Sequence, residues 1–559
     1  MRESGCSVSV VESGLRTESL PFSSIPGQSK LFIDYQQNPL SLKKYYPSIV
    51  SAHTEVAERI PEVLASYTTD RNVLCEALTQ INKQFGADTK TLENIIILRE
   101  DDAVAVVTGQ QTGLFTGPLY SIYKALTVVK MTECLRGRGI NAVPVFWMAT
   151  EDHDVEEVSN AFVIDGGQEL AEFRVSADES ESGRPVGTID LGASVSSAVA
   201  ELLASLPQIE FTDDLRRQLE LSWAEGNSFG LAFGTFLTSL LGKYGLIFVD
   251  PLDETLKQLS APIYSEAIRR SGEIVTALTA RSAGLVSDGY HAQVLVERDY
   301  FPLFWHTDEG RRVALRRKPD GQLQVKGEKT IFLESELAER ALSEPQRFSP
   351  GVMLRPVVQD HLFPTICYFG GGAEIAYFAQ NSEVYRILNR PVTPILHRQS
   401  FTIVEAKHAR TLEKYEFEFA DLFAGEADLL PKIVDKFIDP NTARLFAAAE
   451  EKINTELNRL DQALSQMDVT LAANLATRRR KIIYHIGALR KKYQFRRAEK
   501  DETISRRIHS AFTTLLPSGH LQERTLNVTS FLDRFGPSFI DKVYDSIDLD
   551  DKSHRIVYL

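Results

Sequence analysis

The sequence predicts an α/β protein with a Rossmann-like parallel sheet core, two β-rich insertions and a long α-helical coiled-coil domain. Within residues 104–154, two apolar runs are joined by a glycine-rich turn and a helical segment, the order of a strand–helix–strand unit. Short apolar runs bounded by turn residues recur at 245–251 and 362–369, as in buried parallel strands. Beyond residue 401, apolar residues follow a heptad spacing.

Composition and charge exclude several classes of protein. The chain has 559 residues, too many for one core, so several domains are expected. A formal net charge of −14 argues against a general affinity for nucleic acid or anionic membranes. No apolar run is long enough to span a bilayer, and residues 1–14 lack the basic start and apolar stretch of a secretory signal. We therefore expect a cytoplasmic protein that binds neither nucleic acid nor membrane.

The order of these patterns predicts the domain organisation. In chain order we expect N-terminal helices with the first half of the core (1–160), a first insertion with helices (161–244), the core continued (245–285), a second insertion (286–360), the end of the core (361–400), a helical coiled-coil domain (401–510) and a C-terminal segment that packs on the core (511–559).

Each element follows from its local pattern. Apolar runs predict strands at 104–107, 143–148, 245–249, 362–369 and 392–396. Helical periodicity predicts helices over 40–84, 88–99, 119–136, 194–206, 212–222, 229–243, 252–281 and 375–389. Residues 161–192 and 290–333 alternate in polarity between turn signals, which predicts the two β-rich insertions. The second insertion is locally basic, with Arg311, Arg312, Arg316, Arg317 and Lys318.

The late helical region has a heptad seam and opposite charges. The seam residues are spaced 4, 3, 4, 3 and 4 apart and are continued by Leu475: Ile453, Leu457, Leu460, Leu464, Met467 and Leu471. Residues 473–497 carry nine Lys or Arg and no acidic residue, whereas 413–428 carry six acidic residues and one Lys. This contrast predicts an antiparallel hairpin or a dimer contact. For the basic stretch 478–497, a solvated coiled-coil face is favoured over a site for a phosphate-bearing ligand.

The turn at 108–118 is the first candidate binding site. Its glycines allow close approach of a ligand, its Thr and Gln side chains are neutral donors, and the following helix offers free N–H groups to an anion. It matches neither the dinucleotide fingerprint nor a Walker loop. A tight turn that only closes a strand–helix join is the alternative. The candidate ligand residues are Thr108, Gly109, Gln110, Gln111, Thr112, Gly113, Thr116 and, two turns into the helix, Lys124.

The second candidate follows the strand at 143–148 and contains Glu151, Asp152, His153 and Asp154. His153 could act as a general base or a transition-state donor, with Asp152 or Asp154 fixing its tautomer. A metal site is disfavoured, because consecutive side chains on extended backbone alternate in direction. A helix N-cap made by an aspartate is the structural alternative.

Two further turns are weaker candidates. Three glycines, Gly370, Gly371 and Gly372, precede a helix that also carries Glu374 and Asn381 as polar partners. Arg398 lies in a polar turn at 397–400, which a surface turn explains equally well. The four cysteines, Cys6, Cys75, Cys134 and Cys367, are too far apart for a zinc knuckle or a redox pair, so no zinc is expected.

Several motifs together resemble a known family. The runs TGQQTGLFTGPLYSIYKA and PVFWMATEDHDVEEV, with FGGGAEIAYFAQ and TPILHRQSFT, resemble the bacillithiol-synthesis cysteine-adding family, BshC. The resemblance covers nearly the whole chain. It implies a core with two connecting-peptide insertions similar to class I aminoacyl-tRNA synthetases, and a coiled coil that promotes homodimerisation. It also implies the joining of cysteine to glucosaminyl malate.

The chain lacks the HIGH and KMSKS signatures of true synthetases and any zinc-binding cysteine set. In chain order, the 108–118 turn occupies the place of the HIGH signature, and residues 397–400 fall near the place of the KMSKS signature. We expect ATP or another nucleotide to activate the cysteine carboxylate, with Gln110 and His153 facing one cavity. Two alternatives remain: another ATP-dependent ligase or nucleotidyl transferase on the same scaffold, or a non-catalytic coiled-coil protein that assembles partners, including RNA.

Overall fold

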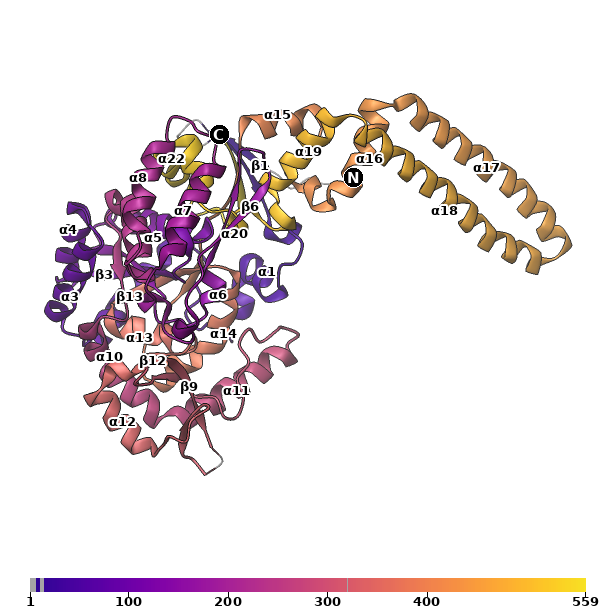
Figure 1. Ribbon diagram of the computed structural model, residues 1–559. Helices are drawn as coiled ribbons and strands as arrows, with labels where there is room; N and C mark the ends of the chain where they lie inside the picture. Colours follow the sequence, from indigo (N-terminus) through magenta and orange to yellow (C-terminus); the bar gives the residue numbers. More distant parts are fainter. Residues whose placement is uncertain (1–6, 11–14, 319) are drawn as a thin grey trace. The chain divides into compact units, whose positions relative to one another are not determined.

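The computed structural model describes residues 7–10, 15–318 and 320–559 (Figure 1). The chain divides into two compact units. The first unit contains residues up to 402 together with 522–557, and the second contains 403–521 together with 558–559. Each unit has its own core.

The first unit is built on a five-stranded parallel sheet. The strands lie in the order β14 (Ile395–His397), β13 (Thr365–Gly370), β3 (Val104–Gln110), β4 (Ala142–Met148) and β7 (Ile247–Val249), and every neighbouring pair is parallel. From β3 the chain builds the sheet in one direction through β4 and β7, and then returns to add β13 and β14 on the other side. This is the Rossmann strand order, which confirms the predicted core and puts its switch point between β3 and β13.

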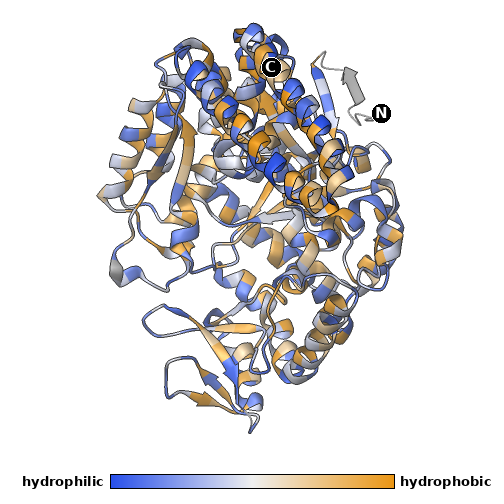
Figure 2. Ribbon diagram, turned by 90° about the vertical axis from the view of Figure 1, so that its right-hand side faces the viewer, coloured by the Kyte–Doolittle hydropathy of each residue, from blue (hydrophilic) through white to orange (hydrophobic). Residues whose placement is uncertain are grey.

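The strands are apolar because helices cover the sheet. All residues of β4 and β7 are buried, as are those of β13. The covering helices contact individual strands: α3 (Arg71–Gln84), α4 (Thr89–Leu98), α5 (Tyr120–Arg136) and α14 (Gly372–Ile387). Many helices alternate between blue and orange along their length in Figure 2, the pattern of amphipathic helices.

Two β-rich insertions interrupt this core. The first contains the hairpin of β5 (Asn160–Ile164) and β6 (Leu170–Arg174) and is followed by α7 (Ala193–Ser205), α8 (Thr212–Ser222) and α9 (Phe229–Leu241). The second is an antiparallel sheet of β11 (Ile331–Phe332), β10 (Leu323–Val325), β9 (Arg312–Arg317), β8 (Leu303–His306) and β12 (Phe348–Pro350), with α12 (Glu334–Ser343).

One long helix in the prediction is two helices in the structure. The expected helix over 252–281 consists of α10 (Glu254–Arg269) and α11 (Ser271–Ser287). The chain leaves the helical conformation at Arg270, whose φ and ψ are −108° and 12°. Ser271 and Gly272 follow, and both are weak helix formers, so the break occurs where propensity is lowest. The prediction of a single helix was wrong because the helical spacing of apolar residues continues across the break.

The remaining elements of this unit surround the core. The helices are α1 (Lys30–Gln37), α2 (Ile60–Ser66), α6 (Val155–Val158), α13 (Arg355–Leu362), α20 (Gln522–Thr525), α21 (Thr529–Phe535) and α22 (Ser538–Asp545). Strand β2 (Arg16–Leu20) pairs with β1 (Ser7–Val10) and with β16 (His554–Tyr558), and β15 (Ser400–Val404) leads out of the unit. Within the described ranges, no helix has the length and apolar content needed to cross a membrane.

The second unit is helical. It contains α15 (Ala406–Tyr415), α16 (Glu426–Ile433), α17 (Pro440–Met467), α18 (Val469–Glu499) and α19 (Glu502–Leu515). Helices α17 and α18 pack against each other as a hairpin, the coiled-coil element of the prediction. A short apolar cluster at its base includes Tyr415, Ile433 and Ile508.

The predicted seam is divided by the hairpin turn. Asp468 has an extended conformation between the two helices, and its side chain accepts the N–H of Thr470 as the cap of α18. Leu471 and Leu475 therefore lie on the second helix rather than continuing the first. The basic stretch contacts acidic partners in the same chain: Arg490 pairs with Asp435 at 2.5 Å.

Candidate active site

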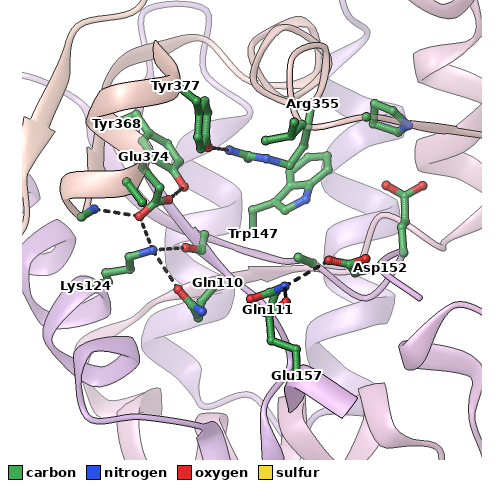
Figure 3. Close-up of a pocket in the computed structure, with 18 of the residues that line it drawn as sticks. Gln110, Gln111, Lys124, Trp147, Asp152, Glu157, Arg355, Tyr368, Glu374 and Tyr377 are labelled. Carbon is green, nitrogen blue, oxygen red and sulfur yellow. Dashed lines mark hydrogen bonds and ion pairs between the residues drawn. The ribbon is translucent and has the colours of Figure 1, made fainter. Parts of the chain in front are cut away.

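A cavity of about 590 Å³ opens at the carboxyl ends of the parallel strands. It is lined by the ends of β3, β4 and β13 and by residues of the second insertion. The position beside the switch point is where open α/β sheets bind ligands. Gln110 and His153 both line this cavity, so the two predicted clusters share one site. Figure 3 shows Gln110 of the first cluster and Asp152 of the second in it.

Lys124 connects the end of β3 to the start of α14, the helix that follows β13. Its ammonium donates to the carbonyl of Gly109 and to Oε1 of Gln110, both at 2.9 Å, and pairs with Oε2 of Glu374 at 2.5 Å. Burial lowers the pKa of the Lys124 ammonium, and the neighbouring carboxylate offsets part of that effect. Figure 3 shows this ammonium at the centre of its three acceptors. Lys124 thus positions the β3 turn and α14 rather than reaching out to a ligand.

The second half of the glycine-rich turn is buried and structural. Asn527, from the C-terminal segment, donates its side-chain N–H groups to the carbonyls of Phe115 at 2.9 Å and Gly117 at 2.8 Å. Phe115 has a positive φ of 52°. A Cβ on Gly113 would lie 2.7 Å from the Cα of Gly117, so only glycine fits there. This part of the turn needs its glycines for its own packing, as the structural alternative supposed.

His153 contacts an arginine that the sequence did not single out. Nη1 of Arg312 lies 3.0 Å from Nδ1 of His153. Because a guanidinium can only donate, Nδ1 is the acceptor, and the proton of the neutral imidazole is on Nε2. The other nitrogens of Arg312 are held by Ser349 at 2.9 Å and the carbonyl of Pro350 at 3.1 Å, and its guanidinium lies 3.7 Å from the ring centre of Phe304. The imidazole therefore presents an N–H donor at Nε2.

Asp152 is held as a carboxylate. Its oxygens accept the Nε2–H of Gln111 at 3.1 Å and the backbone N–H of His153 at 2.8 Å, and Arg312 lies 3.6 Å away. Burial would raise the pKa of Asp152, but these hydrogen bonds and the guanidinium hold that pKa well below its usual value. Asp154 differs from Asp152, because its side chain accepts the N–H of Glu157 and caps α6.

The start of α14 forms the opposite wall. Glu374 accepts the N–H of Gly371 at 2.7 Å and the hydroxyl of Tyr368 at 2.6 Å. Burial alone would raise the pKa of Glu374, but Lys124 and these donors keep that pKa below its usual value. A Cβ on Gly370 would lie 2.8 Å from the Cβ of Glu374, so this glycine allows the side chain to fold back over the turn.

Arg398 lines the cavity from the end of β14, and its side chain is only 5% exposed. Its two terminal nitrogens donate to the carboxylate of Glu523 at 2.9 and 2.8 Å. Ser400 and the backbone N–H of Phe401 donate to the same carboxylate. The pair is therefore buried and fully hydrogen-bonded at the carboxylate, which is the arrangement that a buried ion pair requires.

The structure divides the predicted residues into two groups. Those that line the cavity are Gly109, Gln110, Gln111, Lys124, Asp152, His153, Gly371, Gly372, Glu374 and Arg398. Those that do not are Thr108, Thr112, Gly113, Thr116, Asp154, Gly370 and Asn381. Thr108 instead donates to the carbonyl of Phe369 at 2.7 Å, and Asn381 is completely buried within α14.

Sequence reasoning missed the contribution of the second insertion and α13 to this site. The lining residues that it did not single out include Trp147, Tyr300, Phe304, Arg312, Arg355, Tyr368 and Tyr377. The basic composition around Arg312 was the only local signal for any of them. Among the residues described by the structure, no group of three or more His, Cys, Asp or Glu is arranged to hold a metal ion.

Comparison with known proteins decides the family. The model of the N-terminal Rossmann-like domain of the bacillithiol biosynthesis protein BshC matches residues 15–399, and that of its C-terminal coiled-coil domain matches 401–559. The chain belongs to the BshC family. Similar family members include proteins named "Putative cysteine ligase BshC" from Koribacter versatilis (33% identical; 95% of this chain and 97% of that protein) and Salinibacter ruber (33%; 94% and 96%).

A third relative of the same name, from Solibacter usitatus, is 33% identical over 96% of this chain and 98% of its own length. Membership of the BshC family makes the chain a ligase of bacillithiol biosynthesis. The non-catalytic alternative is thereby set aside.

Proposed function

We propose that this BshC-family chain joins the carboxyl group of L-cysteine to the amine of glucosaminyl malate, which forms an amide and gives bacillithiol. The observation that carries the proposal is the convergence of Gln110, His153 and Gly371 on one open cavity at the switch point. Three strands bring neutral donors, an oriented imidazole and a helix N-terminus to the same space. The names of the relatives point to the same reaction.

Amide formation poses two physical problems. The cysteine carboxylate resists attack until it is activated, and the attacking amine must lose a proton. Negative charge also develops on the carbonyl oxygen as the amine adds. A site that lowers the barrier must therefore place donors where this charge appears, because only interactions that strengthen in the transition state accelerate the chemistry.

The residues beside the switch point fit the phosphate part of ATP or another nucleotide. Gly371 and Gly372 line the cavity at the N-terminus of α14, where the helix offers backbone N–H groups and a favourable dipole. The positively charged Arg398 lies beside them: its Nε would be 3.8 Å from a Cβ on Gly371. A bound nucleotide would supply the phosphoryl or nucleotidyl group that activates the carboxylate. The chain's own part is to hold the anion and exclude water.

His153 acts as a donor in this scheme. With Arg312 donating to Nδ1, the Nε2–H of the imidazole is directed to another acceptor, and the developing oxyanion is the acceptor that the reaction provides. Asp152 accepts hydrogen bonds from the backbone N–H of His153 and from the side chain of Gln111, and so fixes the position of His153 relative to the end of β3. Of the two roles predicted for His153, general base and donor, this tautomer favours the donor.

The coiled coil is proposed to form a homodimer contact. On the hairpin, Leu460 is 47% exposed, Leu471 42% and Met467 81%. A row of apolar side chains on a two-helix hairpin is the surface that a second copy would cover in a coiled-coil assembly. Light scattering of the purified protein tests this: a monomeric mass at micromolar concentration would contradict it.

A product assay tests the reaction. Purified protein is incubated with cysteine, ATP and glucosaminyl malate, and products are identified by mass against reactions with other amine acceptors. The expected product is the cysteinyl amide of the malate-linked sugar. Its absence, with another acceptor used instead, would favour the second ligase hypothesis.

Variants of His153 separate its two possible roles. His153→Ala removes the donor and should lower kcat by about a hundredfold to a thousandfold. His153→Gln keeps an N–H near the position of Nε2 and should retain more activity than the alanine variant. Equal losses in both variants would indicate a base instead. Glu156→Ala, an exposed change three residues away, is the matched control and should keep full activity.

A further inference from the structure

Among the described residues, five cations line the cavity: Lys124, Arg312, Arg355, Arg398 and Arg524. Arg524 is exposed, so water and salt screen its charge. The other four differ in whether their charge is already balanced. Lys124 is paired with Glu374, and Arg398 with Glu523. Arg312 lies 3.6 Å from Asp152, and its N–H groups donate to neighbouring groups of the protein. These side chains hold the walls of the site in place, so they contribute little uncompensated charge to a bound anion.

Arg355 differs from them. In the part of the chain that the structure describes, no carboxylate lies within ion-pair distance of its guanidinium. Its partners are neutral: Oε1 of Gln359 at 3.0 Å and the hydroxyl of Tyr377 at 2.9 Å. The guanidinium also lies 5.4 Å from the ring centre of Tyr368. Figure 3 shows Arg355 extending toward the hydroxyl of Tyr377.

The carboxylate of the same wall, Glu374, favours the charge of Arg355 from a distance but makes no ion pair with it. Glu374 already accepts from Lys124, from the hydroxyl of Tyr368 and from the N–H of Gly371. Arg355 is half-buried, and a partly buried guanidinium without a counter-charge is costly unless a ligand supplies one. Its planar fork of donors matches the two oxygens of a carboxylate.

A second polar group at this end of the cavity also lacks a partner. The hydroxyl of Tyr300 is buried without a hydrogen bond to any described residue, and Tyr300 lines the cavity. It lies 3.5 Å from where a Cβ on Gly351 would be, and the carbonyl of Gly351 accepts the backbone N–H of Arg355 at 2.9 Å. Tyr300 and Arg355 therefore flank the same turn. That turn opens α13, whose N-terminus favours an anion.

We propose that Arg355, oriented by Tyr377 and assisted by the hydroxyl of Tyr300, forms a carboxylate-binding subsite that takes the malate portion of the amine substrate. The proposal rests on the proposed function for the identity of the substrate. It assigns to Arg355 the selection of an acidic sugar over a neutral one.

The competing explanation is that Arg355 only ties α13 to α14 through Tyr377. A structural tie would affect all substrates alike, whereas a carboxylate subsite affects only substrates that carry the carboxylate. The test therefore compares glucosaminyl malate with methyl glucosaminide, which has the same amine and no carboxylate. Arg355→Gln removes the charge, and Arg355→Lys keeps it without the fork.

For glucosaminyl malate, Arg355→Gln should raise KM by about tenfold to a hundredfold, with a smaller rise for Arg355→Lys. KM for methyl glucosaminide, already high in the wild type, should change less than about twofold, because it never used the subsite. Arg386→Gln removes an exposed arginine from the same helix as Tyr377 and is the matched charge control. Equal changes for both substrates, or none for either, would overturn the subsite.

A binding measurement separates this proposal from the proposed reaction. Calorimetric titration of glucosaminyl malate into the wild-type protein, without cysteine or nucleotide, should give binding that weakens by the same factor in Arg355→Gln. If the sugar binds in this way and no amide forms, the reaction is wrong and the subsite stands. If the amide forms but Arg355→Gln binds normally, or if the wild-type protein does not bind the sugar, the subsite is wrong. Unchanged melting of Arg355→Gln and of Arg355→Lys excludes misfolding as the cause.

Discussion

The ion pair between Arg398 and Glu523 ties the C-terminal segment to the end of β14, and its strength can be measured. The pKa of Glu523 is about 2, against an ordinary value of 4.5: burial would raise it, but Arg398 and the other donors outweigh burial. A depression of this size corresponds to about 3 kcal/mol of folding stability at neutral pH. Glu523→Gln removes the charge and leaves Arg398 buried without a counter-ion. We expect it to lower the free energy of unfolding by about 3 kcal/mol.

The pH dependence has a definite sign. Because the folded-state pKa is depressed, the stabilisation is complete above pH 4.5 and is lost as pH falls toward 2. The difference in the free energy of unfolding between the wild type and Glu523→Gln should therefore be constant from pH 7 to about pH 5.5. This difference should fall to about half of its neutral-pH value by pH 3.

Urea denaturation followed by tryptophan fluorescence measures this deficit. All three tryptophans, Trp147, Trp223 and Trp305, lie in the first unit, so the signal reports on the unit that contains the ion pair. Glu62→Gln is the control, because its pair with Arg59 is exposed and should contribute less than about 1 kcal/mol. A deficit below about 1 kcal/mol at pH 7, or one that does not narrow in acid, would refute the reasoning.

Three further changes test other parts of the structure. Gly113→Ala places a Cβ 2.7 Å from the Cα of Gly117 and should cost about 1–3 kcal/mol of stability, measured by the same fluorescence transition. Asn527→Ala leaves buried carbonyls of the β3 turn without their donor; we expect a loss of about 1–3 kcal/mol and a matching fall in kcat/KM. Burial raises the pKa of Cys367, so iodoacetamide at pH 8 should alkylate the half-buried Cys134 before Cys367, as peptide mass analysis would show.

The core of the fold could be predicted because its signals are local. Strands β3 and β4 are continuous apolar runs, and the helix between them has a clear start and end, so neighbouring residues carry the whole pattern. The placement of β4 beside β3 follows from the same logic, since a right-handed crossover adds a new parallel strand next to the last. The return from β7 to β13, on the other side of β3, does not follow from it. The helix break at Arg270 could not be predicted in this way, because the periodicity continues across it.

The site was predictable only where it lies at strand ends. Gln110 and His153 follow β3 and β4 directly, and the carboxyl ends of parallel strands share one edge. Arg312 and Arg355 reach the cavity from the second insertion and α13, and no spacing in the sequence relates them to His153. The packing of the second half of the glycine-rich turn was not predictable for the same reason: Asn527, which donates to the carbonyl of Gly117, lies 410 residues away.

The contacts of Lys124 explain how a glycine-rich turn without Walker spacing could belong to the anion site that we propose. In a Walker loop the lysine is free to contact phosphate. Here the ammonium donates to Gly109 and Gln110 at the end of β3 and to Glu374 on α14, so it links β3 to α14. The lysine thus fixes the two sides of the switch point at a set separation. The N–H of Gly371 is donated to Glu374, so the N–H groups that follow it in the first turn of α14 and the guanidinium of Arg355 are the groups that we propose bind anions. Rigidity and charge are supplied by different residues, so a preorganised site does not need its anchoring cation to touch the substrate.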